Sequence, residues 1–402
     1  MKILTASSFS FAFVLIFSGT LGAQVSDSQL ARWLKRFPQA DVNKDGKLTV
    51  DEAQAFQSKM RSGSDGGAPK SFDVHPGWEE DRFPSHAVCF KSPSEIAKIY
   101  GDVAGDRGLI VSYEKPADGS LRIVGTGHSF MAPGYKTLPL IAKAAGLRQP
   151  PLQTHTSGGV TGSSRYKWEQ ENGIFQFDGK PMPKLLASIS NGEWDVMTWG
   201  PYYNDRARYY SCWIEFCLKY NAEMKFYVSD AWPQLDQLDR IPRSESELTP
   251  ELMRKLADEK YATYLTIVDQ LNSSYDDRVF VMPTCEAMVL CVEQFSKNEL
   301  PGIEGIHKAV GKKERSLWRD KLGHLGPGLE WLEGYVFYAT LYGRSPELID
   351  GAVLEQNKFP SRELDQQFRK IAWQAVLNNP LSGVEDKNQN GIADDREPAL
   401  SE

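Results

Sequence analysis

The chain has 402 residues, which is enough for one large domain or for two or three smaller ones, and its hydrophobic fraction of 41% allows a sizeable core. The formal net charge of -7 argues against nucleic acid as a partner, because proteins that bind phosphate backbones present basic surfaces. The sequence contains no P-loop and no dinucleotide-binding fingerprint, so a nucleotide-binding function has little support.

Residues 1–23 have the pattern of a secretory signal peptide. Lys2 supplies the positive charge, an apolar run covers Phe11 to Phe17, and Ala23 ends a small-residue cleavage site before Gln24. The apolar run is too short to span a bilayer, and no later stretch reaches the necessary length. We therefore expect a secreted or periplasmic protein without a membrane span.

Residues 24–60 contain a loop of alternating oxygen-bearing side chains between two segments with helical periodicity. Gly46 permits a sharp turn in the middle of this loop, and Thr49 can contact a bound ion through water. Calcium takes six to eight oxygen ligands, and the loop supplies them in the required order from Asp41, Asn43, Asp45, the main-chain carbonyl of Lys47, and Glu52. The segment resembles an EF-hand, which implies a small helical module that binds Ca²⁺. The alternative is a polar turn, since Asp, Asn and Gly dominate turns for their own reasons.

Residues 61–72 are rich in Gly and Ser and predict a flexible linker, and residues 73–378 predict one catalytic-sized domain. In that domain we expect strands at 121–125, 152–156, 195–198, 225–228 and 279–282, and helices at 138–145, 183–190, 209–220, 250–271 and 329–342. Strands separated by helices imply βαβ units. The predicted fold is therefore α/β, a three-layer sandwich with a parallel sheet between layers of helices. Functional residues in such sheets gather in loops at the carboxyl ends of the strands.

Those loops contain a set of residues suited to acyl transfer. Ser129 follows the first strand and can act as a nucleophile at a helix N-terminus. Gly159 lets a backbone N–H approach a substrate, and Asn204 can offer its side-chain amide to the same oxyanion. His324 is a candidate base, and Asp320 is a carboxylate that could orient it. Each feature alone is common in loops and cores, so the chain order of the residues is the stronger observation.

That order resembles the SGNH (GDSL-type) hydrolase superfamily over roughly residues 110–346. The segment His128-Ser129-Phe130-Met131 is similar to the first block of a bacterial branch, and the segment that starts at His324 is similar to its last block. The resemblance implies an SGNH/flavodoxin-like fold, with Ser129 as nucleophile and His324 as base. It also implies an oxyanion hole made of Ser129 N–H, Gly159 N–H and Asn204.

The chain departs from the family pattern at three places. Gly-Asp-Ser is replaced by Gly127-His128-Ser129, and the Gly-x-Asn-Asp block is stretched to Gly200-Pro-Tyr-Tyr-Asn204-Asp205. The usual Asp-x-x-His has one extra residue between Asp320 and His324. The last departure puts the role of Asp320 in question, because a backbone carbonyl could orient the imidazole instead.

Residues 379–402 contain a second, weaker copy of the calcium loop in a C-terminal tail. Its candidate ligands are Asp386, Asn388, Asn390, the carbonyl of Ile392, Asp394 and Glu397. Ala393 stands where the core-facing apolar residue belongs, and Pro398 prevents a long exiting helix. The loop is therefore similar to those of thrombospondin type 3 repeats or dockerins. A disordered acidic tail is the alternative.

The cysteines and aromatic residues leave several interpretations open. Five cysteines in an exported protein allow two disulfides, with Cys212–Cys217 and Cys285–Cys291 as short-range candidates, or pairing across the two groups, or simple burial. Five aromatic residues could stack on sugar rings, which would suit an acylated carbohydrate as substrate, or could belong to the core: Tyr166, Trp199, Tyr202, Tyr203 and Trp232.

Two functions from different classes are consistent with these features. The first is a secreted serine esterase with structural Ca²⁺, acting on a small ester or an acylated carbohydrate. The second is a calcium-binding, non-catalytic surface or adhesion protein on a degenerate hydrolase fold. The side-chain distance between Ser129 and His324 discriminates between them.

Overall fold

The structure is a computed structural model that describes residues 30–31, 34, 40–53, 55, 116–156, 185–200, 206–351, 353–354 and 358–397. The chain divides into two compact units, residues 1–72 and 73–402. The predicted signal peptide and the predicted linker at 61–72 lie outside the described residues. No helix in the described part of the chain is long and apolar enough to cross a membrane.

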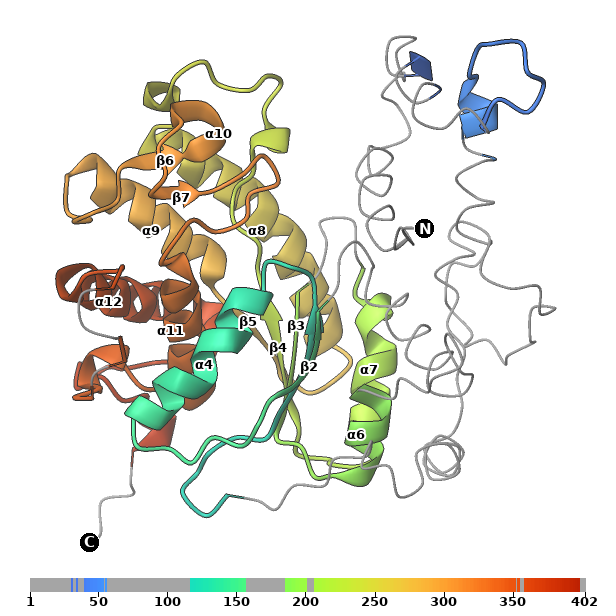
Figure 1. Ribbon diagram of the computed structural model, residues 1–402. Helices are drawn as coiled ribbons and strands as arrows, with labels where there is room; N and C mark the ends of the chain where they lie inside the picture. The colour runs from blue at the N-terminus through green and yellow to red at the C-terminus, as the bar shows by residue number, and fades with distance from the viewer. Residues whose placement is uncertain are drawn as a thin grey trace, which may run out of the picture. The chain divides into compact units, whose positions relative to one another are not determined.

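A five-stranded parallel sheet lies at the centre of the second unit (Figure 1). Its strands are β1 (Ile123–Gly127), β2 (Gln153–Thr156), β3 (Val196–Trp199), β4 (Lys225–Ser229) and β5 (Val279–Met282). The strand order is β2-β1-β3-β4-β5, and neighbouring strands are parallel. This confirms the predicted α/β class with a parallel central sheet flanked by helices.

Side chains of the central strands alternate between two separate cores. Ile123 and Val196 point into one core, whereas their neighbours Val124 and Met197 point into the other. This period of two is the geometry of a strand that is covered on both faces. It explains why strands β3 and β5 have mostly apolar sequences, whereas the edge strand β2, Gln153–Thr156, is polar and only partly buried.

Helices cover both faces of the sheet (Figure 1). On one face lie α6 (Leu185–Asn191) and α7 (Arg208–Leu218), and on the other lie α4 (Ala132–Ala144), α11 (Leu329–Tyr342) and α12 (Arg362–Asn378). In the described part of the second unit, the other helices of four or more residues are α8 (Pro250–Asn272), α9 (Thr284–Ser296) and α10 (Lys308–Gly311). A small parallel sheet pairs β6 (Gly305–His307) with β7 (Ser316–Trp318), and short 3₁₀ helices lie at 235–237, 245–247, 346–348, 380–382 and 394–396.

The helix boundaries agree with the sequence expectations at four of the five predicted helices to within two residues, and α4 is the exception. It begins at Ala132 rather than Leu138, because Pro133 fits the first turn of a helix, where its missing N–H would have no partner. Helices α9 and α12 were not among the predicted elements.

The disulfide hypothesis is wrong for the described cysteines. Cys212, Cys217, Cys285 and Cys291 are all buried free thiols. Each short-range pair lies on a single helix, α7 or α9, where the rigid backbone separates side chains five or six positions apart. These cysteines are therefore core residues.

The described residues of the first unit form a small apolar cluster. Leu30, Ala40, Leu48 and Ala53 are buried together, so Leu48 is directed inward as the calcium-loop pattern requires. Residues 30–31, 34, 50–53 and 55 are helical, which places helix on each side of the loop.

Candidate active site

Ser129 lies in the turn that joins the carboxyl end of β1 to the N-terminus of α4. It is exposed, whereas the β1 residues before it are almost completely buried. In an open parallel sheet, ligands bind where the strand order reverses, outside the carboxyl ends of the strands. Here β2 lies on one side of β1, and β3, the next strand along the chain, lies on the other side. The strand order therefore reverses at β1, and Ser129 follows the carboxyl end of this strand.

Ser129, His324 and Asp320 form a continuous hydrogen-bonded chain. Ser129 Oγ is 2.7 Å from His324 Nε2. On the opposite side of the ring, His324 Nδ1 is 2.9 Å from Asp320 Oδ2 and 3.1 Å from Oδ1. The structure thus brings together three residues separated by up to 195 positions, in the arrangement of nucleophile, base and orienting carboxylate.

The extra residue between Asp320 and His324 does not separate their side chains. Gly323 adopts a left-handed conformation with φ 86°, and its N–H donates to the carbonyl oxygen of Asp320 at 3.0 Å. Asp320 Oδ1 accepts the backbone N–H groups of Leu322 and His324 at 3.0 and 3.2 Å. The five residues therefore form a tight turn around the carboxylate, and this turn places it against the imidazole.

These contacts also determine the charge of Asp320. Partial burial raises the pKa of its carboxyl group, but hydrogen bonds and charge from His324, together with the Leu322 N–H, outweigh burial and place the pKa below its ordinary value. Asp320 is therefore ionised at neutral pH and can accept a hydrogen bond from the N–H group at His324 Nδ1. This leaves Nε2 without a proton in the neutral ring, which is the form that can accept one from Ser129.

Aromatic rings enclose the base on one side. The ring of Phe130 meets His324 edge-on with centroids 5.1 Å apart, and it stacks on Trp232 at 4.9 Å. Trp232 and Trp199 are 1% and 0% exposed, so neither can stack on a sugar ring. These two aromatic residues are core residues. Tyr166, Tyr202 and Tyr203 lie outside the described residues.

Gly159 and Asn204, the other two predicted oxyanion donors, also lie outside the described residues. The backbone N–H of Ser129 has no acceptor among the described residues, and it lies next to the positive end of α4. Gly200 starts the turn after β3, close to Gly127 at the end of β1. The described stretch that contains β3 therefore ends at Gly200, close to the end of β1.

Residues 41–52, the segment predicted to bind calcium, form a loop in which side-chain oxygens accept backbone N–H groups of the same loop. The Gly46 N–H donates to Asp41 Oδ2 at 2.9 Å, the Asp45 N–H to Asn43 Oδ1 at 2.9 Å, and the Lys47 N–H to Asp45 Oδ1 at 2.8 Å. Glu52 reaches back over the loop toward the Asn43 N–H at 3.5 Å. Asp41 Oδ1 is buried without a hydrogen-bond partner, which suits a carboxylate oxygen that binds a cation.

The C-terminal loop has the same conformation. The Gly391 N–H donates to Asp386 Oδ2 at 2.9 Å, the Asn390 N–H to Asn388 Oδ1 at 3.1 Å, and the Ile392 N–H to Asn390 Oδ1 at 2.8 Å. The fourth and sixth positions have φ of 58° and 83° here, against 60° and 80° in the first loop. Glu397 again closes the loop, where its Oε1 accepts from the side-chain amides of Asn388 and Asn390 at 2.6 Å.

The side chain of Asp394, another predicted ligand, contacts Lys387. Its Oδ1 accepts the Lys387 N–H at 3.0 Å, and Lys387 Nζ lies 3.7 Å from its Oδ2. Across the described residues, no three His, Cys, Asp or Glu side chains converge on one point. The predicted ligand sets also include amide and main-chain carbonyl oxygens, those of Asn43 and Lys47 in one loop and of Asn388, Asn390 and Ile392 in the other.

The C-terminal loop belongs to the same compact unit as the sheet. Ala393 occupies the loop position from which a larger apolar residue would be expected to reach the core. It is nevertheless 0% exposed and part of the main core. The Ala393 N–H donates to Gly343 O at 2.8 Å, and the Ser345 N–H donates to Gly391 O at 2.7 Å. The loop therefore forms a β-bridge with the turn that follows α11.

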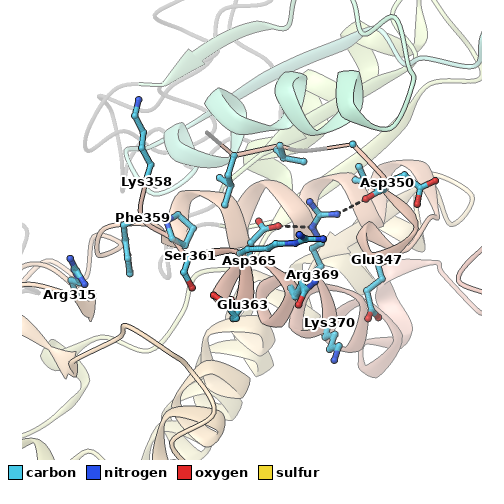
Figure 2. Close-up of a pocket in the computed structure, with 17 residues that line it drawn as sticks. Arg315, Glu347, Asp350, Lys358, Phe359, Ser361, Glu363, Asp365, Arg369 and Lys370 are labelled. Atoms are coloured by element: carbon cyan, nitrogen blue, oxygen red, sulfur yellow. Dashed lines mark hydrogen bonds and ion pairs between the residues drawn. The ribbon is translucent and has the colours of Figure 1, made fainter. Parts of the chain in front are cut away.

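A cavity of about 1120 Å³ lies beside the N-terminal part of α12, and its lining contains none of the three triad residues (Figure 2). The buried cation in its lining, Arg369, already binds Asp365 Oδ2 at 2.9 Å and the carbonyl oxygen of Ile349 at 2.7 Å. Arg315 lies over the Phe359 ring, 4.9 Å from its centroid. The chemistry of the triad, rather than this volume, identifies the candidate active site.

Comparison with known proteins identifies no family. No protein-family model and no curated protein matches the sequence. Among solved structures, the fold is similar to a DUF4886 family protein from Bacteroides uniformis, with 12% sequence identity and a TM-score of 0.41 over 64% of this chain and 95% of the other.

Proposed function

We propose that this chain is a serine ester hydrolase of the SGNH-like kind. The observation that carries the proposal is the chain of hydrogen bonds from Ser129 Oγ through the His324 ring to Asp320, with contacts of 2.7 and 2.9 Å. The two loops are almost 200 positions apart in the sequence. A Ser–His hydrogen bond at the surface adds little to stability, so the stability of the fold does not require this alignment, whereas catalysis does.

In the proposed reaction, Ser129 Oγ attacks the carbonyl carbon of an ester, and its proton moves to His324 Nε2. Asp320 holds the ring by Nδ1 and stabilises the positive charge that forms on it. The Ser129 N–H, beside the positive end of α4, donates to the oxyanion. The C–O bond to the alcohol then breaks, and the alcohol leaves with the proton from Nε2. Water repeats the sequence on the acyl-serine and releases a carboxylic acid.

We also propose that both loops bind Ca²⁺, which would be held by Asp41, Asn43, Asp45, Lys47 and Glu52 in one loop and by Asp386, Asn388, Asn390, Ile392 and Glu397 in the other. The orphaned Asp41 oxygen and the matched backbone conformations support this. The ion would bind the carboxylate, amide and main-chain oxygens of each loop and would stabilise the loop conformation. It has no part in the reaction.

The experiment that tests the enzyme proposal measures hydrolysis of p-nitrophenyl acetate by the protein lacking residues 1–23, with Ser129→Ala alongside. We expect turnover in the wild type and only the background rate in the variant, with circular dichroism unchanged. Equal rates in the two proteins would favour the second function, a non-catalytic calcium-binding surface or adhesion protein. A small ester is used because it needs no contact beyond the triad, and because Trp199 and Trp232 are too buried to stack on a sugar ring.

A further inference from the structure

The loop that carries both Asp320 and His324 is short and exposed. The Leu322 side chain is 44% exposed, and the Asp320 side chain is 40% exposed. Such a loop would ordinarily be mobile, yet the reaction needs the imidazole fixed to within a fraction of an ångström. Contacts from outside the loop must therefore hold it.

Two side chains from the segment after β4 bind successive carbonyl groups of this loop. Trp232 Nε1–H donates to the Gly323 carbonyl oxygen at 2.6 Å, and Gln234 Nε2–H donates to the Leu322 carbonyl oxygen at 2.7 Å. The two donors are two residues apart, so they fix the two peptide planes immediately before His324. A Cβ on Gly323 would lie only 3.2 Å from Gln234 Cγ, which shows how closely the two segments meet.

A buried lysine sets the orientation of the Gln234 amide. Lys260, on α8, is 8% exposed, and its Nζ donates to Gln234 Oε1 at 2.6 Å. Since an ammonium group can only donate, it requires the amide oxygen to face it and so turns the amide NH₂ toward Leu322. Burial lowers the pKa of Lys260 while Asp236 raises it. Burial of an ammonium group costs free energy of desolvation. The hydrogen bond to Gln234 gives this buried group a partner and therefore a structural role.

We propose that Gln234, oriented by Lys260, is a positioning residue that holds the Asp320–His324 loop in its catalytic geometry. The proposal rests on the hydrolase function for its catalytic consequence. Its structural part, that Lys260 and Gln234 restrain residues 319–325, can be measured without any substrate.

The test compares Gln234→Glu, Gln234→Ala and Lys260→Met, with Lys255→Met as a matched control on the exposed side of α8. Gln234→Glu is the decisive variant. Its carboxylate still pairs with Lys260 and so preserves folding, but it cannot donate to Leu322 and places a negative oxygen against that carbonyl. We expect kcat/KM for p-nitrophenyl acetate to fall about tenfold in Gln234→Glu, which loses a hydrogen bond and gains a repulsive contact, and to fall less in Gln234→Ala, which only loses the hydrogen bond. Lys260→Met should show a smaller loss.

Two further readouts separate positioning from general structural damage. The acid limb of the pH–rate profile should move in Gln234→Glu, because His324 loses its fixed alignment with Asp320, and the melting temperature should stay near that of wild type. Hydrogen exchange of peptide 319–325 should accelerate in all three variants and not in Lys255→Met. Unchanged kinetics and exchange in Gln234→Glu would overturn the proposal.

Failure of the hydrolase function is recognised separately. If wild-type protein shows no Ser129-dependent turnover, the enzyme proposal fails. Exchange at 319–325 then decides alone whether Gln234 and Lys260 restrain the loop, and unchanged exchange in the variants overturns that as well.

Discussion

Replacing Asp320 by asparagine should damage the site more than replacing it by alanine. In the wild type, Asp320 Oδ1 accepts the Leu322 and His324 backbone N–H groups, while Oδ2 faces His324 Nδ1 at 2.9 Å. An asparagine keeps its oxygen on the two N–H donors, so its NH₂ group must take the place of Oδ2. That NH₂ donates to Nδ1 and moves the ring proton to Nε2, where it faces Ser129 Oγ and cannot accept the serine proton.

The magnitude follows from the two effects combined. Loss of the negative charge beside the imidazolium and the wrong tautomer together should reduce kcat about 10⁴-fold, as for a triad carboxylate replaced by its amide. This corresponds to about 5.5 kcal/mol of barrier, at 1.36 kcal/mol for each factor of ten. Asp320→Ala loses the charge and the acceptor of the Leu322 and His324 N–H groups but leaves the tautomer free, and we expect roughly a 10³-fold loss.

The assay is the kcat of p-nitrophenyl acetate hydrolysis for the wild type and both variants, with the folded fraction measured in parallel. We expect both variant proteins to fold and to keep Ser129 in place. An asparagine variant as active as the wild type, or clearly more active than the alanine variant, would refute the tautomer argument and with it the role of Asp320.

Three other outcomes are expected. Burial raises the pKa of Asp230 from 3.8 to about 7. The folded state therefore binds this proton more tightly than the unfolded chain does. The stabilisation that results is complete below about pH 4 and is lost as the pH rises through about 7. Asp230→Asn should therefore gain up to about 4 kcal/mol of unfolding free energy relative to wild type between pH 4 and pH 8, measured by urea denaturation, and a constant difference would contradict the assignment. Isothermal titration should count two Ca²⁺ in the wild type and one in either Glu52→Gln or Glu397→Gln, and chelation should lower the melting temperature more than turnover; full and reversible loss of activity on chelation would argue against a structural role. Gly323→Ala should destabilise by about 1–2 kcal/mol through its positive φ and lower kcat, whereas Gly119→Ala, with a similar φ of 79° and no neighbour within 4 Å, should cost stability alone.

The central sheet could be predicted because the inner strands β1, β3 and β4 are mostly buried on both faces. Residues such as Val124, Met197 and Val281 leave continuous apolar runs that end in glycine or polar loops, and the helices between them indicate parallel pairing. Helices α9 and α12 were missed for different reasons. The α9 sequence is apolar around most of its circumference because it is largely buried, and the start of α12 follows residues 350–361, which have no clear periodic pattern.

The triad was predicted from the order of Ser129 and His324 along the chain, and the position of Asp320 was not settled by sequence. Spacing alone suggested that one extra residue would separate Asp320 from the ring, but the left-handed Gly323 folds that residue into the turn. Trp232, Gln234 and Lys260 could not be predicted as partners of this loop. The contacts of Trp232 and Gln234 with the loop join residues 91 and 88 positions apart, and Lys260 lies 26 positions from Gln234. A glutamine or a lysine in a sequence does not indicate which carbonyl or amide it will meet.

The most direct test of the central claim is covalent labelling of the wild-type protein with a fluorophosphonate, followed by intact mass measurement and peptide mapping. An activated serine attacks phosphorus and displaces fluoride, so we predict a single adduct on Ser129 that is absent in Ser129→Ala and much slower to form in Asp320→Asn. No adduct on Ser129, or labelling that is the same in Asp320→Asn and the wild type, would contradict a working Ser129–His324–Asp320 triad.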